Sequence, residues 1–335
     1  MEAQTFTLPV HDATQIGAAR RVAVTAAEPL GISEVDAGRV ALVATELATN
    51  LVRHGGGGEL LVRPLTRANH IGLEIVALDR GPGMTDLEEA LRDGYSTSGT
   101  NGSGLGAVRR LAHRFAVFSA PGAGTAVLAR LFFDRPPTGA WPLVSGVSVA
   151  KAGETACGDA WCWTADPDGW TVLVADGLGH GADASFAASE AVRVFLGHPG
   201  AALPDIMAAA HAALRPTRGA ALGFARLSLA RRELGFLGVG NVGGTILSAG
   251  AGRNLVSLPG IVGHECRKVQ EFTYPWSDQA AVVLFSDGLQ TRWTLDRYPA
   301  ITSRDPALLA ALLYRDFSRG RDDVTVVVGR GAEPA

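Results

Sequence analysis

The chain has 335 residues, of which 47% are hydrophobic and 19% charged, and its formal net charge is -3. The length allows two domains of ordinary size, and the composition is typical of a globular protein rather than a disordered one. The small net charge gives no sign of a nucleic-acid partner. No stretch approaches the roughly 20 consecutive apolar residues that are needed to span a bilayer.

The cysteines and the N-terminus indicate a compartment. Cys157, Cys162 and Cys266 are odd in number and lack metal-ligand spacing, which is typical of free thiols in a reducing environment. The first 12 residues are polar and lack the apolar run of a signal peptide. We therefore expect a cytoplasmic protein without a membrane segment.

The first functional pattern is a helix predicted over residues 33–54, where apolar residues recur at steps of three and four. Glu46 and Asn50 are four positions apart, so they lie on one face of this helix. A carboxylate and an amide there can serve a hydrated magnesium ion, and the carboxylate can act as a base. For this pair alone, a solvated helix face is the more common explanation.

The second pattern follows a strand predicted over residues 71–78. Asp79 stands at the strand end, with Gly81 and Gly83 two and four residues later. The glycines permit a tight turn and a close approach of the backbone to a ligand. The Asp79 carboxylate could accept a hydrogen bond from the exocyclic amine of adenine. An ordinary strand-to-loop turn explains this stretch about as often.

The third pattern is a glycine-rich turn, Gly102, Gly104 and Gly106, before a helix predicted over residues 107–115. Such a turn offers free N–H groups and a favourable helix dipole to phosphate. A dinucleotide-binding Rossmann turn is excluded, because a polar segment and not a strand precedes it. That segment covers residues 85–101, and its second half is rich in Gly, Ser and Thr, as expected of a mobile lid over the phosphates.

In this order, the three patterns resemble the N, G1 and G2 boxes of the GHKL ATPase family, over about residues 5–133. The compact form is similar to anti-sigma-factor and stress-switch serine kinases. The resemblance implies that Glu46 is the base, Asn50 the magnesium ligand and Asp79 the residue that reads adenine. No box is broken, which favours an active kinase over an inactive ATP sensor. The residues implied at the nucleotide are Asn50, Asp79, Gly81, Gly83, Gly102, Gly104, Leu105, Gly106 and Thr125.

A linker is predicted over residues 135–142. Pro136, Pro137, Gly139 and Pro142 cannot continue a helix or a central strand. The linker divides the chain into an N-terminal domain of residues 1–134 and a C-terminal domain of residues 143–335.

Four aspartates of the second domain stand at the ends of predicted apolar strands. Asp159 precedes residues 161–164, Asp176 follows 171–175, Asp287 follows 281–285, and Asp322 precedes 324–328. Strand ends can bring such carboxylates to one rim of a sheet, and hard divalent cations prefer oxygen ligands. Any one Asp-Gly pair is more often an ordinary turn, but four in this order favour a metal centre.

These four motifs resemble the metal-dependent PPM serine/threonine phosphatases, in their SpoIIE-like bacterial branch, over about residues 143–330. The resemblance implies that Asp176 bridges two metals and is catalytic, and that Gly177 supplies a carbonyl ligand. Asp159 would hold one ion through its shell, and Asp287 and Asp322 would hold the other.

In that family the first residue of the last motif is the ligand, so Asp322 is preferred to Asp323. A water activated by the metals would attack phosphorus in line, without a phospho-enzyme. His180 is a candidate acid for the leaving oxygen, and a turn-stabilising role explains it equally well.

Together these features predict an α+β protein of two domains. The first is a GHKL α/β sandwich with helices on one face of a mixed sheet, and the second is a PPM α-β-β-α sandwich. The expected cofactors are ATP with Mg²⁺ in the first domain and two Mn²⁺ or Mg²⁺ ions in the second.

The predicted function is a bifunctional partner switch. One domain would phosphorylate, and the other dephosphorylate, a STAS-domain antagonist or stressosome-type protein, with a sigma factor as a further candidate partner. One alternative is a phosphatase whose N-terminal domain only binds ATP or a sigma factor. Another is a scaffold with two silent sites. The sequence leaves the oligomeric state open.

Overall fold

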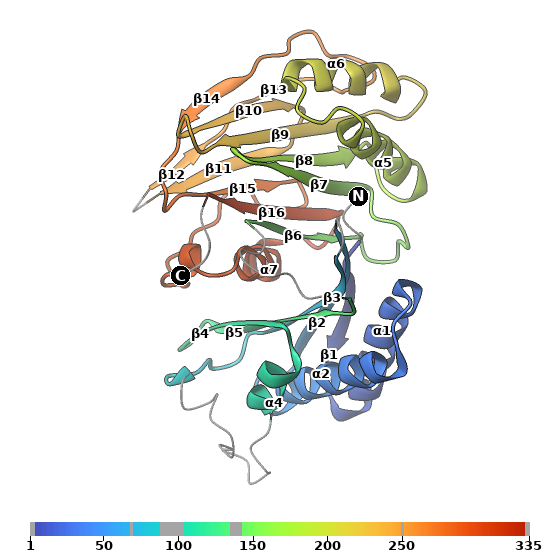
Figure 1. Cartoon of the computed structure of the whole chain (residues 1–335), viewed down its shortest axis with the longest axis vertical. Coiled ribbons are helices and arrows are strands. Elements are labelled where there is room, and N and C mark those ends of the chain that lie inside the picture. Colours follow the sequence, from blue (N-terminus) through green and yellow to red (C-terminus); the bar gives the residue numbers. More distant parts are fainter. Residues whose placement is uncertain (1–3, 68–69, 88–103, 135–142, 249–250, 332–335) are drawn as a thin grey trace. The chain divides into compact units, whose positions relative to one another are not determined.

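The computed structural model describes residues 4–67, 70–87, 104–134, 143–248 and 251–331. The predicted linker, residues 135–142, lies outside the described residues. The chain forms two compact units, drawn in Figure 1. One contains Thr5–Ala140 and Thr294–Leu312, and the other contains Met1–Gln4, Trp141–Trp293 and Leu313–Ala335. Each unit is described by itself.

The first unit contains a five-stranded sheet of order β1-β2-β3-β5-β4. All of its described pairings are antiparallel, so the expectation of a mixed sheet is corrected. The reason is that the β4–β5 hairpin folds back and places β5, not β4, beside β3. The strands are β1 (Phe6–Val10), β2 (Gly58–Arg67), β3 (His70–Asp79), β4 (Arg114–Ala120) and β5 (Gly124–Phe132).

Helices α1 (Ile16–Ala27), α2 (Glu34–Arg53) and α4 (Gly104–Leu111) pack their apolar sides on this sheet (Figure 1). Two short 3₁₀ helices, η1 (Ala13–Gln15) and η2 (Glu28–Leu30), flank α1. The predicted helix over residues 33–54 is confirmed as α2, which begins after the Ser33 cap.

The predicted helix over residues 107–115 is wrong at both ends. The helix α4 begins at Gly104 and ends at Leu111, and Arg114 already belongs to β4. Pairing of β4 with β5 overrides the local helical pattern at this end.

A chain of charged side chains crosses the middle of this sheet. Arg63, Glu74 and Arg130 are register partners on β2, β3 and β5. Arg63 Nη2 lies 2.8 Å from Glu74 Oε1, and Arg130 Nε lies 2.7 Å from Glu74 Oε2. Burial alone would raise the pKa of Glu74, but the two guanidinium groups hold that pKa below its usual value. All three side chains are buried, so each depends on the others to offset its desolvation.

Residues 294–312 belong to this first unit, although they lie far along the sequence inside the predicted second domain. Asp305 binds Arg130 through two contacts, 2.7 Å to Nη1 and 3.0 Å to Nη2. Its Oδ1 also accepts from Ala307 N at 2.9 Å, at the start of α7 (Pro306–Phe317). Tyr298 packs its ring on the edge of Phe118, with 5.8 Å between centroids. Because the ion pair joins residues 175 positions apart, no local pattern predicts it.

The second unit contains two sheets. The first has the order β13-β10-β9-β8-β7, with β14 also paired to β10, and the second has the order β12-β11-β15-β16-β6. Only the β10–β13 pairing is parallel among the described pairs of this unit. The strands are β6 (Val144–Val149), β7 (Asp159–Asp166), β8 (Gly169–Gly177), β9 (Ala220–Ser228), β10 (Glu233–Val239), β11 (Gly243–Ser248), β12 (Ala251–Asn254), β13 (Ser257–Leu258), β14 (Phe272–Pro275), β15 (Ala281–Phe285) and β16 (Val324–Arg330).

The two sheets pack face to face around a core that includes Trp161, Trp170 and Phe236. Helices α5 (Ala182–Leu196) and α6 (Leu203–Leu214) cover the other face of the first sheet with alanine and larger apolar residues (Figure 1). A 3₁₀ helix, η3 (Ile301–Ser303), precedes α7 in the chain. The predicted two-domain α+β organisation is confirmed, and in both units helices lie on sheets.

Among the described residues, no helix is both long enough and apolar enough to cross a bilayer.

The Arg130–Asp305 pair yields a test of the first unit. We expect Asp305→Asn to lower the free energy of unfolding by about 2–3 kcal/mol, because it leaves a buried guanidinium short of a counter-charge while keeping an oxygen to cap α7. Urea denaturation followed by far-UV circular dichroism measures this loss, because all six tryptophans belong to the second unit. The control is Asp278→Asn, which removes an exposed pair with Arg232 and should cost less than about 1 kcal/mol. Equal effects of the two variants would contradict the prediction.

Candidate ATP site and candidate metal centre

The candidate ATP site begins on one face of α2. Glu46 and Asn50 are both half-buried there, one helical turn apart. The amide nitrogen of Asn50 is buried and has no hydrogen-bond partner among the residues that the structure describes. A Cβ at Gly104 would lie 3.1 Å from Asn50 Oδ1, so the first turn of α4 starts beside this amide. A buried amide without a partner, next to a helix N-terminus, suits a ligand with phosphate oxygens and a hard cation.

Asp79 is the last residue of β3, and its carboxylate organises the turn that follows. Asp79 Oδ1 accepts from Gly81 N at 2.8 Å and from Thr125 N at 3.1 Å. These two bonds fix the orientation of the carboxylate at the point where β3 ends and β5 begins. The turn also packs closely on the end of α2, since a Cβ at Gly55 would lie 2.6 Å from Asp79 Cβ.

The turn after Asp79 is also held from the other side. Gly83 has a φ of +72°, and a Cβ there would lie 2.0 Å from Ala120 O, so only glycine fits. Met84 N donates to Ser119 Oγ at 2.8 Å, and Ser119 Oγ lies 3.0 Å from Thr125 Oγ1. Thr125 is thus joined to the Asp79 turn by both its backbone and its hydroxyl. The sequence did not single out Ser119, which lies near the end of β4 and outside the three motifs.

The third glycine motif is only partly described. Gly104, Leu105 and Gly106 form the first turn of α4. Gly102 and the predicted lid beyond residue 87 lie outside the described residues. The structure therefore brings Glu46, Asn50, Asp79, Gly81, Gly83, Gly104, Leu105, Gly106 and Thr125 into one unit, with α2 and α4 in contact beside the sheet.

The candidate metal centre lies at the edge of the first sheet of the second unit. Asp159 and Asp176 are register partners on β7 and β8, so two carboxylates of like charge stand directly opposite each other. Burial, the charge of Asp176 and the charge of Asp323 raise the pKa of Asp159 well above its usual value. Ser286 Oγ donates to Asp159 Oδ2 at 2.5 Å. Asp159 is 5% exposed, so water screens this repulsion poorly.

The pKa of Asp176 is raised by the same two causes, burial and neighbouring negative charge. Burial and then the charges of Asp287 and Asp322 raise the pKa of Asp176 to about 7. Its Oδ2 is buried and has no hydrogen-bond partner in the described part of the chain. Asp287 is oriented by Asn241, whose Nδ2 donates to Asp287 Oδ2 at 2.7 Å. Asn241 lies outside the four motifs that the sequence assigned to this site.

Asp322 and Asp323 both contribute to the negative charge of the candidate metal centre. Asp323 N donates to Asp322 Oδ1 at 3.0 Å, and Asp323 Oδ1 accepts from Lys151 N at 2.8 Å. Asp323 is 4% exposed, whereas Asp322 is half-buried. A Cβ at Gly158 would lie 2.6 Å from Asp323 Oδ2, so the segment before Asp159 reaches this oxygen closely. Asp323, which the sequence set aside in favour of Asp322, therefore belongs to the same cluster.

These residues fit a divalent cation. Among the described residues, no group of three or more His, Cys, Asp or Glu side chains is arranged to hold an ion as it stands. The donor set nevertheless consists of hard oxygens, and the buried Oδ2 of Asp176 has no hydrogen-bond partner among the described residues. Since unpaired buried carboxylates are costly, a cation is the group that would satisfy them.

Three further residues lie near the centre. Gly177 closes β8, and its N–H donates to Gly158 O at 3.1 Å. His180 is exposed, and its Nδ1 lies 2.7 Å from Glu154 Oε1, which joins the two loops at this edge. Cys157 is buried, and burial raises the pKa of its thiol, which disfavours the thiolate form. The described cysteines are free thiols, as predicted.

Two family models match the chain. Residues 10–131 match the histidine kinase-like ATPase domain, and residues 166–330 match stage II sporulation protein E (SpoIIE). The serine/threonine-protein kinase RsbT of Bacillus subtilis (strain 168) is 38% identical over 114 residues, which cover 34% of this chain and 86% of that kinase.

Two solved structures are also similar. One comes from work on the bacterial stressosome as a modular system adapted to control secondary messenger signalling. It has 29% identity and a TM-score of 0.52, and it covers 56% of this chain and 98% of its own. The other is RsbX in complex with magnesium, with 21% identity, a TM-score of 0.48, and coverage of 56% and 94%.

The first domain is thus kinase-like and the second phosphatase-like. The chain belongs to the histidine kinase-like ATPase family that includes RsbT, and it carries a SpoIIE domain in the same polypeptide.

The repulsion among the buried carboxylates leads to a prediction about the free energy of unfolding. Without divalent cations, we expect Asp176→Asn to raise the free energy of unfolding at pH 8 by roughly 1–3 kcal/mol, because it removes a buried charge from the cluster. The same variant should lose most of the rise in melting temperature that Mn²⁺ gives the wild type. Thermal denaturation with and without Mn²⁺ measures both effects. The exposed Asp205→Asn serves as the control and should keep the wild-type response. A variant that responds fully to Mn²⁺ would remove Asp176 from the metal centre.

Proposed function

We propose that the chain is a bifunctional partner switch acting in the cytoplasm. Its first domain would transfer phosphate from ATP to a serine or threonine of a STAS-domain antagonist or stressosome-type protein. Its second domain would remove phosphate from the same or a related partner with two Mn²⁺ or Mg²⁺ ions. A sigma factor is a further candidate partner of the first domain.

The observation that carries this proposal is the coexistence of two sites in one chain. An RsbT-like domain contains Glu46, Asn50 and Asp79 in the order expected of an ATP site, and a SpoIIE domain gathers buried carboxylates of like charge. The similarity to a stressosome structure supports a partner of that kind. One domain alone would be consistent with a one-way enzyme, whereas both together favour a reversible switch.

In the proposed kinase reaction, the chain positions the reactants and supplies a base. Glu46 would accept the proton of the incoming hydroxyl, and Asn50 would hold Mg²⁺ or a phosphate oxygen. Asp79, oriented by the amides of Gly81 and Thr125, would accept a hydrogen bond from adenine. Phosphoryl transfer depends mostly on such positioning and on charge stabilisation, so a rigid Asp79 turn suits it.

In the proposed phosphatase reaction, Asp159, Asp176, Asp287 and Asp322 would hold the ions, with Gly177 O as a further ligand. Asp323 and Asn241 orient the cluster through their hydrogen bonds to Lys151 N and Asp287. When bound, the ions would supply a nucleophile at neutral pH and neutralise the phosphate. His180, already held by Glu154, remains a candidate proton donor to the leaving oxygen.

The kinase assignment is tested with Glu46→Gln, which keeps the shape of the side chain but removes the base. We expect phosphate transfer to a purified STAS protein to fall by about 100-fold or more, with ATP affinity nearly unchanged. Transfer is measured with radiolabelled ATP, and affinity with a fluorescent ATP analogue. The control is Glu34→Gln, an exposed glutamate at the start of the same helix.

The result separates the two candidate roles of the first domain. If the wild type binds ATP but labels no STAS partner, the first domain is a binding module and the kinase proposal is wrong. If Glu46→Gln and Glu34→Gln both transfer at the wild-type rate, Glu46 is not the base.

The phosphatase assignment is tested on a small ester. We expect the wild type to hydrolyse p-nitrophenyl phosphate with Mn²⁺, and Asp176→Asn or EDTA to reduce the rate by at least about 100-fold. On a STAS protein labelled by the first domain, Mn²⁺ should release the label from the wild type. Release from the partner by Asp176→Asn at the wild-type rate would rule out the proposed metal centre. Label that the wild type never releases would rule out a shared substrate.

A further inference from the structure

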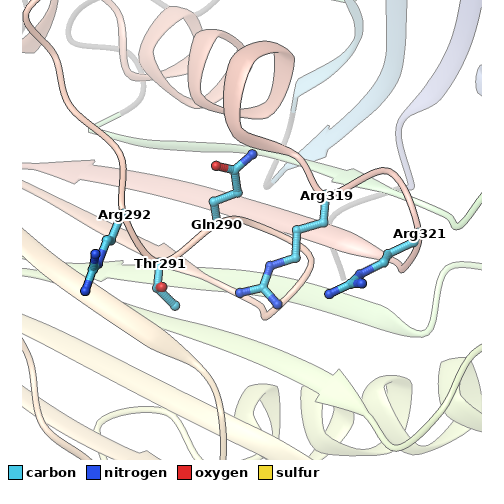
Figure 2. A pocket seen from close by; sticks show the side chains of 5 residues that line it. All are labelled: Gln290, Thr291, Arg292, Arg319 and Arg321. Atoms are coloured by element: carbon cyan, nitrogen blue, oxygen red, sulfur yellow. The ribbon is translucent and has the colours of Figure 1, made fainter.

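A pocket of basic character lies beside the metal centre, built entirely from residues of the second unit. It has a volume of about 460 Å³ and is lined by Gln290, Thr291, Arg292, Arg319 and Arg321. Figure 2 shows the three arginines extending to the same side of the ribbon, while Gln290 points away from them. All five residues are exposed, so the pocket is accessible from solvent.

The backbone connects this pocket to the candidate metal ligands. Leu289 and Ser318 form an antiparallel bridge between the two segments that carry the arginines. Arg319 N donates to Gly288 O at 2.8 Å, and Gln290 N donates to Phe317 O at 2.9 Å. Asp287 precedes the first segment and Asp322 follows the second. The two segments that carry the arginines are therefore joined to each other by backbone hydrogen bonds. The same two segments also carry Asp287 and Asp322.

The arginines of this pocket lack counter-charges. In the part of the chain that the structure describes, Arg292, Arg319 and Arg321 have no ion pair. Other exposed arginines of this unit do pair, such as Arg193 with Glu190 and Arg218 with Asp183. The lining contains no carboxylate. Three like charges around one cavity repel each other, so an anion bound there would be favoured over an empty pocket.

We propose that this pocket is a docking subsite for anionic groups that flank the scissile phosphoserine or phosphothreonine of a protein substrate. The inference rests on the proposed phosphatase function and names part of its substrate specificity. Guanidinium groups bind carboxylates and phosphates through paired N–H donors, so acidic side chains or a second phosphoryl group would both fit. The metal centre holds the scissile group, and the arginines hold what lies beside it.

The subsite is tested by binding, with the full-length protein and Mn²⁺. The probes are three fluorescent peptides with a non-hydrolysable phosphonate in place of phosphoserine. One has flanking glutamates, one has a flanking phosphoserine, and one has neutral flanks. We expect Arg319→Ala/Arg321→Ala to weaken the two anionic peptides by about tenfold and the neutral peptide by less than about twofold. Fluorescence anisotropy at two salt concentrations should show the wild-type preference fading as salt rises.

Two further variants keep the test falsifiable. Arg319→Lys/Arg321→Lys keeps the charge and should retain most of the binding, and the exposed Arg215→Ala should bind as the wild type does. Equal loss of all three peptides would show that the arginines hold the scissile group, which overturns a flanking subsite. No loss of the anionic peptides would also overturn it.

The test of the anion subsite and the test of the phosphatase function can give opposite results. If the protein binds anionic peptides through these arginines but hydrolyses no phosphate ester, the phosphatase proposal fails and the anion subsite stands. If hydrolysis depends on Asp176 while the arginine variants bind every peptide normally, the phosphatase proposal stands and the subsite fails.

Discussion

Asp159 and Asp176 face each other on neighbouring strands, and Asp287, Asp322 and Asp323 add to the same negative charge. The two sheets of the second unit are held together by an apolar core, which places these strand ends where water is scarce. The carboxylates repel one another there, and Asp176 Oδ2 has no hydrogen-bond partner within the described ranges. The apolar packing that stabilises the sandwich therefore also strengthens the repulsion among the carboxylates, and a divalent cation would reduce this repulsion.

The first unit uses the opposite arrangement of charge. Glu74 stands between Arg63 and Arg130, and Asp305 balances the remaining guanidinium charge, so this buried cluster is neutral in sum. Such a cluster needs no ligand and serves the structure. The partly buried Asn50 amide, by contrast, lacks a hydrogen-bond partner on the face where the ATP site is expected. Satisfied polar groups hold the sheet, and an unsatisfied one marks the candidate site.

A chain with a kinase-like and a phosphatase-like domain has one copy of each site per molecule. In the proposed switch, the direction of net phosphate flow would then depend on ATP, metal and partner, and not on the relative abundance of two proteins. The basic pocket adds a means of selecting the phosphorylated partner, since exposed arginines act mainly through association rate and specificity. Without selection of the phosphorylated partner, the two proposed activities would together only hydrolyse ATP.

The sequence by itself determined the boxes around Glu46, Asp79 and Asp176 and the α+β character, because strand periodicity and Asp-Gly or glycine-rich turns are local patterns. It also placed α2 well, since the apolar spacing of this helix agrees with its tertiary packing. Only the tertiary structure decided what depends on long-range contact. It put β5 beside β3, joined Asp305 to Arg130, and drew Asp323, Ser286 and Asn241 into the carboxylate cluster. These pairings join residues up to 175 positions apart, and their energy comes from burial and charge neutralisation that no local window of sequence contains.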